Sequence, residues 1–200
     1  MKAPYFTGSA LESVARCALL KFDVEYMNRQ PAPIPIEYII ENVYGLTLDF
    51  RHLTNNSRLL GKTIFDDGVT PYYNTDTGRY EFIKVKAGTM MLETKLADEG
   101  VFGRLRFTEA HELAHWLLHQ KLYAGTHETA AFLSSDQDSI TEYQANIVAS
   151  HLLMPKCLVK RAFFALRGLD ADDVTQELAG TFAVSREAMS YRLKDLKLTI

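Results

Sequence analysis

Hydrophobic residues recur every three to four positions near the start of the chain, which is the spacing of an amphipathic helix. This spacing predicts a helix over residues 10–27, on Leu11, Val14, Ala18, Leu19 and Phe22. A proline-rich break follows at residues 31–35. The next pattern predicts a short second helix over residues 36–43, which ends at Gly45 because glycine readily adopts the conformation that closes a helix.

From residue 46 onward the pattern changes to β-branched and aromatic residues separated by turn residues. It predicts strands over residues 46–50, 62–65 and 80–85, a loop at 55–57, turns at 66–68 and 75–78, and a loop with a short helix over 87–101. An edge strand of such a sheet can pair with an extended peptide, or the sheet can simply cover the core. The pattern leaves both open, and it makes Tyr72, Tyr73 and Asn74 candidates to face a cleft.

The second half of the chain returns to helical spacing. Residues 106–119 form one predicted helix, with an apolar stripe at Phe107, Ala110, Ala114, Leu117 and Leu118. A further helix is predicted from near Ser139 to the residue before Pro155. The tail carries two short helical patterns around a tight turn, with Ser185 as the natural N-cap of the second, and thus resembles a helix-turn-helix.

Composition and charge narrow the class of protein. The chain has 200 residues, 47% hydrophobic and 24% charged, which suits one globular domain with a small appendage. A net charge of −3 does not suggest a nucleic-acid partner. Two unpaired cysteines, Cys17 and Cys157, favour buried reduced thiols rather than a disulfide scaffold. The start of the chain lacks a signal-peptide core and no apolar run is long enough to span a membrane, so we expect a cytoplasmic protein.

The predicted helix over residues 106–119 contains the motif His111-Glu112-Leu113-Ala114-His115. On a helix the two histidines lie about 40° apart around the axis and about 6 Å apart along it, so both rings can bind one zinc ion. Glu112 lies beside them, towards the open side, where a carboxylate can accept a proton from an attacking water. The alternative is an amphipathic helix with two histidines that serve packing alone.

A catalytic zinc bound by two histidines needs a third protein ligand, and a carboxylate commonly supplies it. Glu142 on the next helix is the best candidate, with Asn146 one turn later to accept the free N–H of a ligating histidine. Ser139 and Glu142 also match a capping box, in which the glutamate only caps its own helix. We interpret His119 as a structural or surface histidine, because it lies about 12 Å along the helix from His111 and cannot share a metal with it. His151 is interpreted as structural, because it lies about 180° around the helix from Glu142 and faces away from the site.

Two stretches, RFTEAHELAHWLLH at 106–119 and EYQANIVASHLLMP at 142–155, together resemble the ImmA/IrrE metallopeptidases. The usual family pattern is RFTxAHELgHxLLH followed by ExEANxFAaxLLMP. The resemblance implies zinc on His111, His115 and Glu142, with Glu112 as catalytic base and acid, and it favours the ligand role of Glu142 over the capping box. Gln144, Ala114 and Trp116 depart from the pattern without touching a ligand.

The helix-turn-helix pattern of the tail has two interpretations. DNA binding would use Arg186, Tyr191, Arg192 and Lys194. However, residues 170–200 hold four basic and six acidic side chains, and phosphate attraction supplies most of DNA affinity. We therefore favour a tail that packs on the preceding domain or contacts a protein partner, and direct DNA binding is not expected.

These observations predict an α+β fold: a zincin-like domain over residues 1–165, with a small sheet packed on helices, and a helical tail over residues 166–200. The expected function is that of an intracellular zinc endopeptidase, and the resemblance implies a helix-turn-helix transcriptional repressor as its protein substrate. Two alternatives remain: a non-proteolytic protein that binds a repressor or a toxin–antitoxin pair, and a DNA-binding regulator with a structural zinc site. The ligands would also accept manganese or iron, although zinc suits them best.

Overall fold

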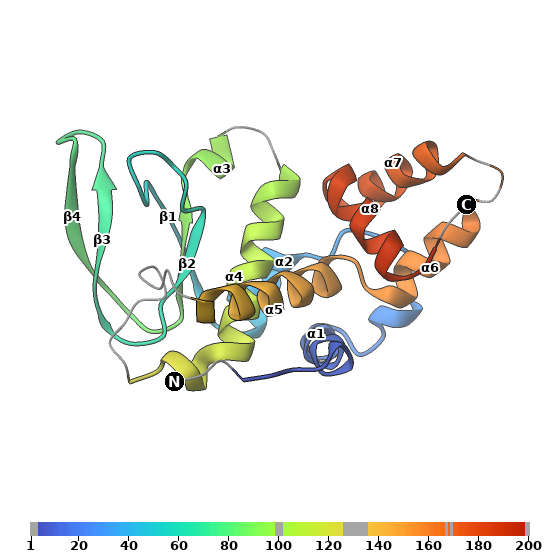
Figure 1. Cartoon of the computed structure of the whole chain (residues 1–200), viewed down its shortest axis with the longest axis horizontal. Helices are drawn as coiled ribbons and strands as arrows, with labels where there is room; N and C mark the ends of the chain where they lie inside the picture. The colour runs from blue at the N-terminus through green and yellow to red at the C-terminus, as the bar shows by residue number, and fades with distance from the viewer. Residues whose placement is uncertain (1–3, 99–101, 126–135, 167, 169, 199–200) are drawn as a thin grey trace.

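The computed structural model of the chain describes residues 4–98, 102–125, 136–166, 168 and 170–198. It is elongated, with a β-hairpin at one end, the tail helices at the other, and two crossing helices between them (Figure 1). The predicted α+β class is confirmed. None of the described helices has the length and apolar character that crossing a membrane requires.

The N-terminal part wraps around the core before the sheet begins. Its elements are α1 (Gly8–Phe22), the 3₁₀ turn η1 (Tyr26–Asn28), α2 (Ile36–Tyr38) and the π-helical turn η2 (Ile39–Val43). Thr7 caps α1 by accepting from the backbone N–H of Ala10. The predicted helix over residues 10–27 therefore ends early, because extended backbone at Asp23 stops it at Phe22.

Two small sheets follow. The first has the order β1–β5–β2, from β1 (Thr47–Arg51), β2 (Gly61–Thr63) and β5 (Thr89–Glu93). Strand β5 runs parallel to β1 and antiparallel to β2. The second sheet is the antiparallel hairpin of β3 (Gly68–Asn74) and β4 (Arg79–Val85), which projects from the body of the protein (Figure 1).

One strand contradicts the sequence-based expectation. Residues 87–101 were expected to form a loop with a short helix; the helix is present as α3 (Lys95–Asp98), but β5 is the central strand of its sheet. Every residue of β5 is buried. A strand covered on both faces shows no alternation of polar and apolar residues, so the period that identifies strands was missing.

Helices α4 (Phe102–Tyr123) and α5 (Asp136–Leu153) pack against each other at the centre of the molecule (Figure 1). Their contact faces use small side chains: Ala110, Ala114, Ala145 and Ala149 are completely buried. Small residues allow two helices to approach closely, so polar side chains near the crossing can meet. The crossing of α4 and α5 is therefore what positions the candidate site.

The chain ends with α6 (Lys156–Ala165), α7 (Ala171–Phe182) and α8 (Arg186–Asp195). Ser185 caps α8 as predicted, accepting from the N–H of Ala188. A left-handed residue, Ala183, turns the chain between α7 and α8, and the Arg106 guanidinium of α4 donates to its carbonyl at 3.2 Å. Arg192 of α8 is 2% exposed and donates to the carbonyl of Met154 at 3.0 Å.

These contacts join the last two helices to α4 and to the end of α5. Gly103 of α4 lies so close to the turn before α8 that an added Cβ would stand 3.1 Å from the backbone nitrogen of Ser185. Of the four side chains considered for DNA binding, Arg192 is buried and Arg186 pairs with Asp172 at 2.7 Å. The division of the chain at residue 165 remains a prediction.

Candidate metal centre

Helix α4 presents His111 and His115 on the face that meets α5. Leu113 and Ala114 between them are completely buried, which fixes the rotation of the helix. His115 is 6% exposed and His111 is half-buried. The Nε2 atoms of the two rings lie 3.0 Å apart, so both rings turn towards the same point, as their spacing of one helical turn allows.

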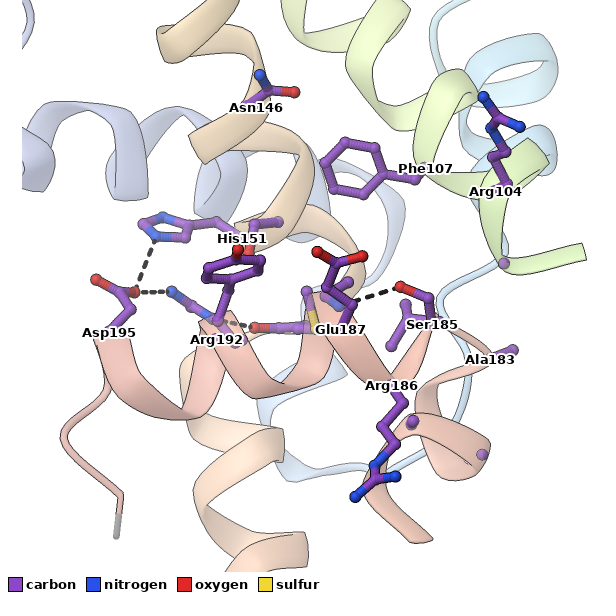
Figure 2. A pocket seen from close by; sticks show the side chains of 18 of the residues that line it. Arg104, Phe107, Asn146, His151, Ala183, Ser185, Arg186, Glu187, Arg192 and Asp195 are labelled. Atoms are coloured by element: carbon purple, nitrogen blue, oxygen red, sulfur yellow. Dashed lines mark hydrogen bonds and ion pairs between the residues drawn. The ribbon is translucent and has the colours of Figure 1, made fainter. Parts of the chain in front are cut away.

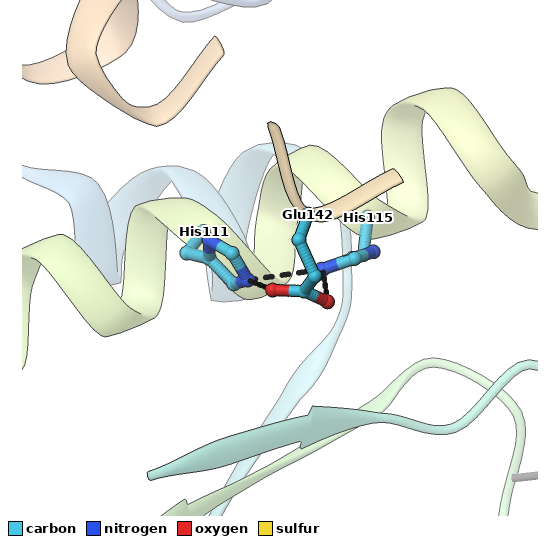
Figure 3. A group of neighbouring side chains, drawn as sticks. All are labelled: His111, His115 and Glu142. Carbon is cyan, nitrogen blue, oxygen red and sulfur yellow. Dashed lines mark hydrogen bonds and ion pairs between the residues drawn. The ribbon is translucent and has the colours of Figure 1, made fainter. Parts of the chain in front are cut away.

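Helix α5 brings the carboxylate of Glu142 to that point. Its Oε2 lies 3.1 Å from Nε2 of His111, and its Oε1 lies 3.1 Å from Nε2 of His115 (Figure 3). Among the described residues these three form a group whose ligand atoms all lie within 4.8 Å of one another. The structure thus brings together the three side chains that the sequence proposed as ligands. Because α5 begins at Asp136, Ser139 lies inside the helix and the capping-box alternative is wrong.

Asn146 holds His111 from its other side. Its Oδ1 lies 3.0 Å from Nδ1 of His111. An amide oxygen can only accept, so the ring donates its Nδ1 proton, and in the neutral ring the unprotonated nitrogen is the Nε2 directed at Glu142. This is the contact expected for Asn146, one helical turn after Glu142.

A longer chain of contacts lies behind His115, and the sequence did not indicate it. Nδ1 of His115 lies 3.1 Å from Nδ1 of His119, and Nε2 of His119 lies 3.0 Å from Oε1 of Gln144. The Gln144 amide nitrogen donates to the carbonyl of Pro4 at 2.7 Å. His119 has no exposed surface, and burial lowers its pKa to about 4 although the hydrogen bond to Gln144 opposes this. The spacing of four residues between His115 and His119 was the available signal.

Glu112 lines a hollow beside the cluster but is more enclosed than expected. The residue is 5% exposed and its carboxylate contacts β2. The Thr63 hydroxyl donates to its Oε2 at 2.7 Å. Gly61 leaves room for the other oxygen, since a Cβ at this position would stand 2.4 Å from Oε1. Strand β2 therefore fixes the orientation of the Glu112 carboxylate, and neither Thr63 nor Gly61 belongs to a motif that sequence reasoning could use.

The cluster favours a positive charge at its centre. Burial alone would raise the pKa of Glu142, but hydrogen bonds with His111 and His115 hold it well below its ordinary value. Burial likewise lowers the pKa of His111, yet the Glu142 carboxylate outweighs it and raises the pKa overall. A proton or a metal cation can supply this charge.

The donor set fits zinc. Two imidazole nitrogens and one carboxylate are the ligands of many catalytic zinc sites, which keep a fourth position free. Bonds of about 2.0–2.1 Å in a tetrahedral site place ligand atoms about 3.4 Å apart, close to the 3.0–3.1 Å that separates them here. Small side-chain shifts would therefore bring the three groups around one ion.

Two hollows adjoin the cluster. The first, of about 340 Å³, is lined by the three candidate ligands, Glu112 and the backbone segment 58–63. Tyr72, Tyr73 and Asn74, which were candidates to face a cleft, do not line it; Tyr72 and Asn74 donate instead to Glu81 within the hairpin. The second is a groove of about 1060 Å³ between α4, α5 and the pair α7–α8.

The groove has mostly apolar walls and meets the first hollow at Phe107 and Asn146, which line both (Figure 2). Three aromatic side chains that line it are largely exposed: Phe102 at 61%, Tyr143 at 63% and Tyr191 at 65%. The hollow at the metal cluster therefore adjoins a larger apolar groove at Phe107 and Asn146.

A helix with an HExxH motif, crossed by a second helix that supplies a carboxylate beside a small sheet, is the arrangement of zincin-like metallopeptidases. Comparison with known families agrees. Residues 102–194 match the Peptidase_M78 family model, described as the IrrE N-terminal-like domain. The match agrees with the resemblance of this segment to the ImmA/IrrE metallopeptidases that was drawn from the sequence. No curated protein matches the chain.

Proposed function

We propose that this protein is a zinc-dependent endopeptidase that cleaves another protein in the cytoplasm. The observation that carries the proposal is the convergence of His111, His115 and Glu142 within hydrogen-bonding distance, with Glu112 fixed beside them. The match of residues 102–194 to a peptidase family model supports the same reaction class. His111, His115 and Glu142 would hold the metal, and Asn146 would orient His111.

Bound zinc supplies Lewis acidity, which polarises the scissile carbonyl and acidifies a water molecule. Glu112 acts as the general base towards that water and then returns the proton to the leaving amine. Thr63 holds the carboxylate in place through its hydroxyl. A positioned general base contributes about 10²- to 10⁴-fold to the rate of a reaction.

The free edge of the sheet gives the substrate a place to bind. Leu60 and Ile64 exchange backbone hydrogen bonds with β5, so alternation along β2 directs the peptide groups of Gly61 and Thr63 to the open edge. A substrate in extended conformation can pair there and pass over the cluster. Apolar side chains further along the substrate would lie in the groove that adjoins the cluster at Phe107 and Asn146.

We further propose that the substrate is a helix-turn-helix transcriptional repressor, which would make this protease a regulator of transcription. The family resemblance supports this substrate class. Co-expression with the nearest encoded repressor of that class tests it. We expect a shortened repressor with the wild-type enzyme and an intact one with Glu112→Gln, while both enzymes carry equal zinc.

Two measurements would favour the alternative functions. A repressor that copurifies uncut with the wild-type, zinc-loaded protein would support a non-proteolytic binding protein. A salt-sensitive DNA band shift that survives Glu112→Gln would support a DNA-binding regulator with a structural zinc site. The burial of Arg192 and the pairing of Arg186 disfavour the second alternative.

A further inference from the structure

The contacts behind His115 form a single line that runs from the metal cluster to the N-terminal segment. It passes from His115 to His119, then to Gln144 of α5, and ends on the carbonyl of Pro4. His115, His119 and Gln144 are 6%, 0% and 3% exposed. Buried polar atoms need partners, so each member must either donate or accept in a way that suits its neighbours.

The last member fixes the direction of every hydrogen bond in the line. A carbonyl oxygen can only accept, so Gln144 must turn its amide nitrogen towards Pro4 and its Oε1 towards His119. An amide oxygen also only accepts, so His119 must carry its proton on Nε2. Its Nδ1 is then an acceptor, and His115 must donate from Nδ1. A neutral His115 is left with an unprotonated Nε2, the atom that faces Glu142.

We propose that His119 and Gln144 are positioning residues of the metal centre, which set the tautomer and the ring orientation of His115 before the metal binds. The inference rests on the proposed metal site but not on peptidase activity. A pre-set Nε2 lone pair removes the need for a ring flip or a proton shift when zinc arrives. Because the line ends on the N-terminal segment, it also ties that segment to the metal centre.

The side-chain amide of Gln144 has both groups that the line of hydrogen bonds needs. Glutamine both accepts from His119 and donates to Pro4, whereas a glutamate could only accept when ionised. The sequence pattern that this segment resembles usually has glutamate at this position, and an ionised glutamate could not donate to the Pro4 carbonyl. Two variants therefore separate the contact with His119 from the contact with Pro4. Gln144→Glu keeps the acceptor for His119 and loses the donor to Pro4, whereas Gln144→Met loses both.

Zinc affinity, measured by competition with a chelator, tests the proposal. Partners behind a metal-binding histidine typically contribute 10- to 100-fold to metal affinity. We expect His119→Phe and Gln144→Met to weaken zinc binding by that factor, and Gln144→Glu to change it less than threefold. His151→Phe is the control, because His151 of α5 is likewise a largely buried histidine but pairs with Asp195 of α8 instead of a member of the cluster. Its zinc affinity should equal that of the wild type.

Nitrogen NMR of the two rings gives an independent measurement. We expect the Nε2–H tautomer at His119 and the Nδ1–H tautomer at His115, in both the apo and the zinc-loaded protein. The opposite tautomer at His119, or zinc affinity unchanged in both His119→Phe and Gln144→Met, would overturn the proposal. His115→Ala distinguishes failure of the metal site from failure of the positioning role. If this variant still binds zinc, the proposed metal site is wrong. If it loses zinc while His119→Phe and Gln144→Met bind zinc normally, only the positioning role is wrong.

Discussion

At the scale of single residues, the proposed base depends on a neighbour that has no side chain. Glu112 lies under β2, where the Thr63 hydroxyl holds one oxygen and the bare backbone of Gly61 accommodates the other. The φ angle of Gly61 is not positive, so glycine is required by the close approach rather than by the backbone conformation. The glycine therefore controls where the carboxylate stands.

Gly61→Ala should displace the Glu112 carboxylate without unfolding the protein, because the atoms nearest to the new Cβ all belong to the Glu112 side chain and none to the backbone. We expect the rate of repressor cleavage to fall about 10- to 100-fold, the usual effect of misplacing a catalytic group by about 1 Å. Zinc content should not change. Gly8→Ala is the control, since nothing lies within 4 Å of its added Cβ. Full activity in Gly61→Ala would show that Glu112 tolerates movement and would weaken its assignment as the base.

At the scale of elements, strand β2 contacts both Glu112 beside the metal centre and the β3–β4 hairpin. One of its faces carries Gly61 and Thr63 against Glu112. On the other face Lys62 is 4% exposed, and its ammonium group donates to the Thr70 hydroxyl at 2.8 Å and to the Pro71 carbonyl at 2.7 Å. Lys62 thus attaches the hairpin to the sheet. Burial lowers its pKa to about 8, although Asp49 on β1 opposes the shift.

Because of this lowered pKa, the free energy of unfolding should change with pH in the alkaline range. Between about pH 8 and the ordinary pKa of 10.5, the folded protein has released the Lys62 proton while the unfolded chain still binds it, so stability should rise with pH. The contribution is at most about 3 kcal/mol for a shift of this size. Lys62→Met should abolish this part of the rise. Free energies of unfolding by urea at pH 8 and pH 10 measure the difference, and parallel behaviour of the two proteins would contradict it.

At the scale of the whole molecule, α4 and α5 lie between the two sheets and the last two helices. The two sheets lie on one side of the crossing of α4 and α5, and the pair α7–α8 lies on the other (Figure 1). Buried Arg106 and Arg192 connect this pair to the body of the protein through backbone carbonyls. The groove that results has one wall from α4 and α5 and another from α7 and α8. The tail therefore forms one wall of the groove that adjoins the hollow of the metal centre.

If the groove receives apolar side chains of the substrate, its exposed aromatic residues should matter for cleavage but not for the metal. We expect the double variant Tyr143→Ala, Tyr191→Ala to cut the repressor at least tenfold more slowly, with unchanged zinc content and thermal stability. Both side chains are more than 60% exposed, so their removal leaves no buried cavity. Tyr38→Ala, an exposed tyrosine outside the groove, should behave as wild type. Equal cleavage by all three proteins would exclude the groove from substrate binding.

Local sequence located most of the helices, although α6 was not predicted, and it proposed the members of the metal cluster. The 3.6-residue period located α1, α4, α5, α7 and α8, and the one-turn spacing of His111 and His115 predicted that their rings converge, because both properties depend only on helix geometry. Ser185 as a cap is equally local. Two properties that depend on distant parts of the chain were predicted wrongly. Strand β5 was missed because it is buried on both faces and shows no period. Cys17 was expected to be buried but is exposed.

Only the tertiary structure decided what surrounds those residues. The crossing angle of α4 and α5 brings Glu142 to the histidines and sets Gln144 behind His119, and contact between β2 and α4 buries Glu112 against Thr63. These contacts join residues that are 25 to 49 positions apart in the chain. A period or a motif describes one segment at a time, so it can identify a ligand but not the partner that another segment places beside it.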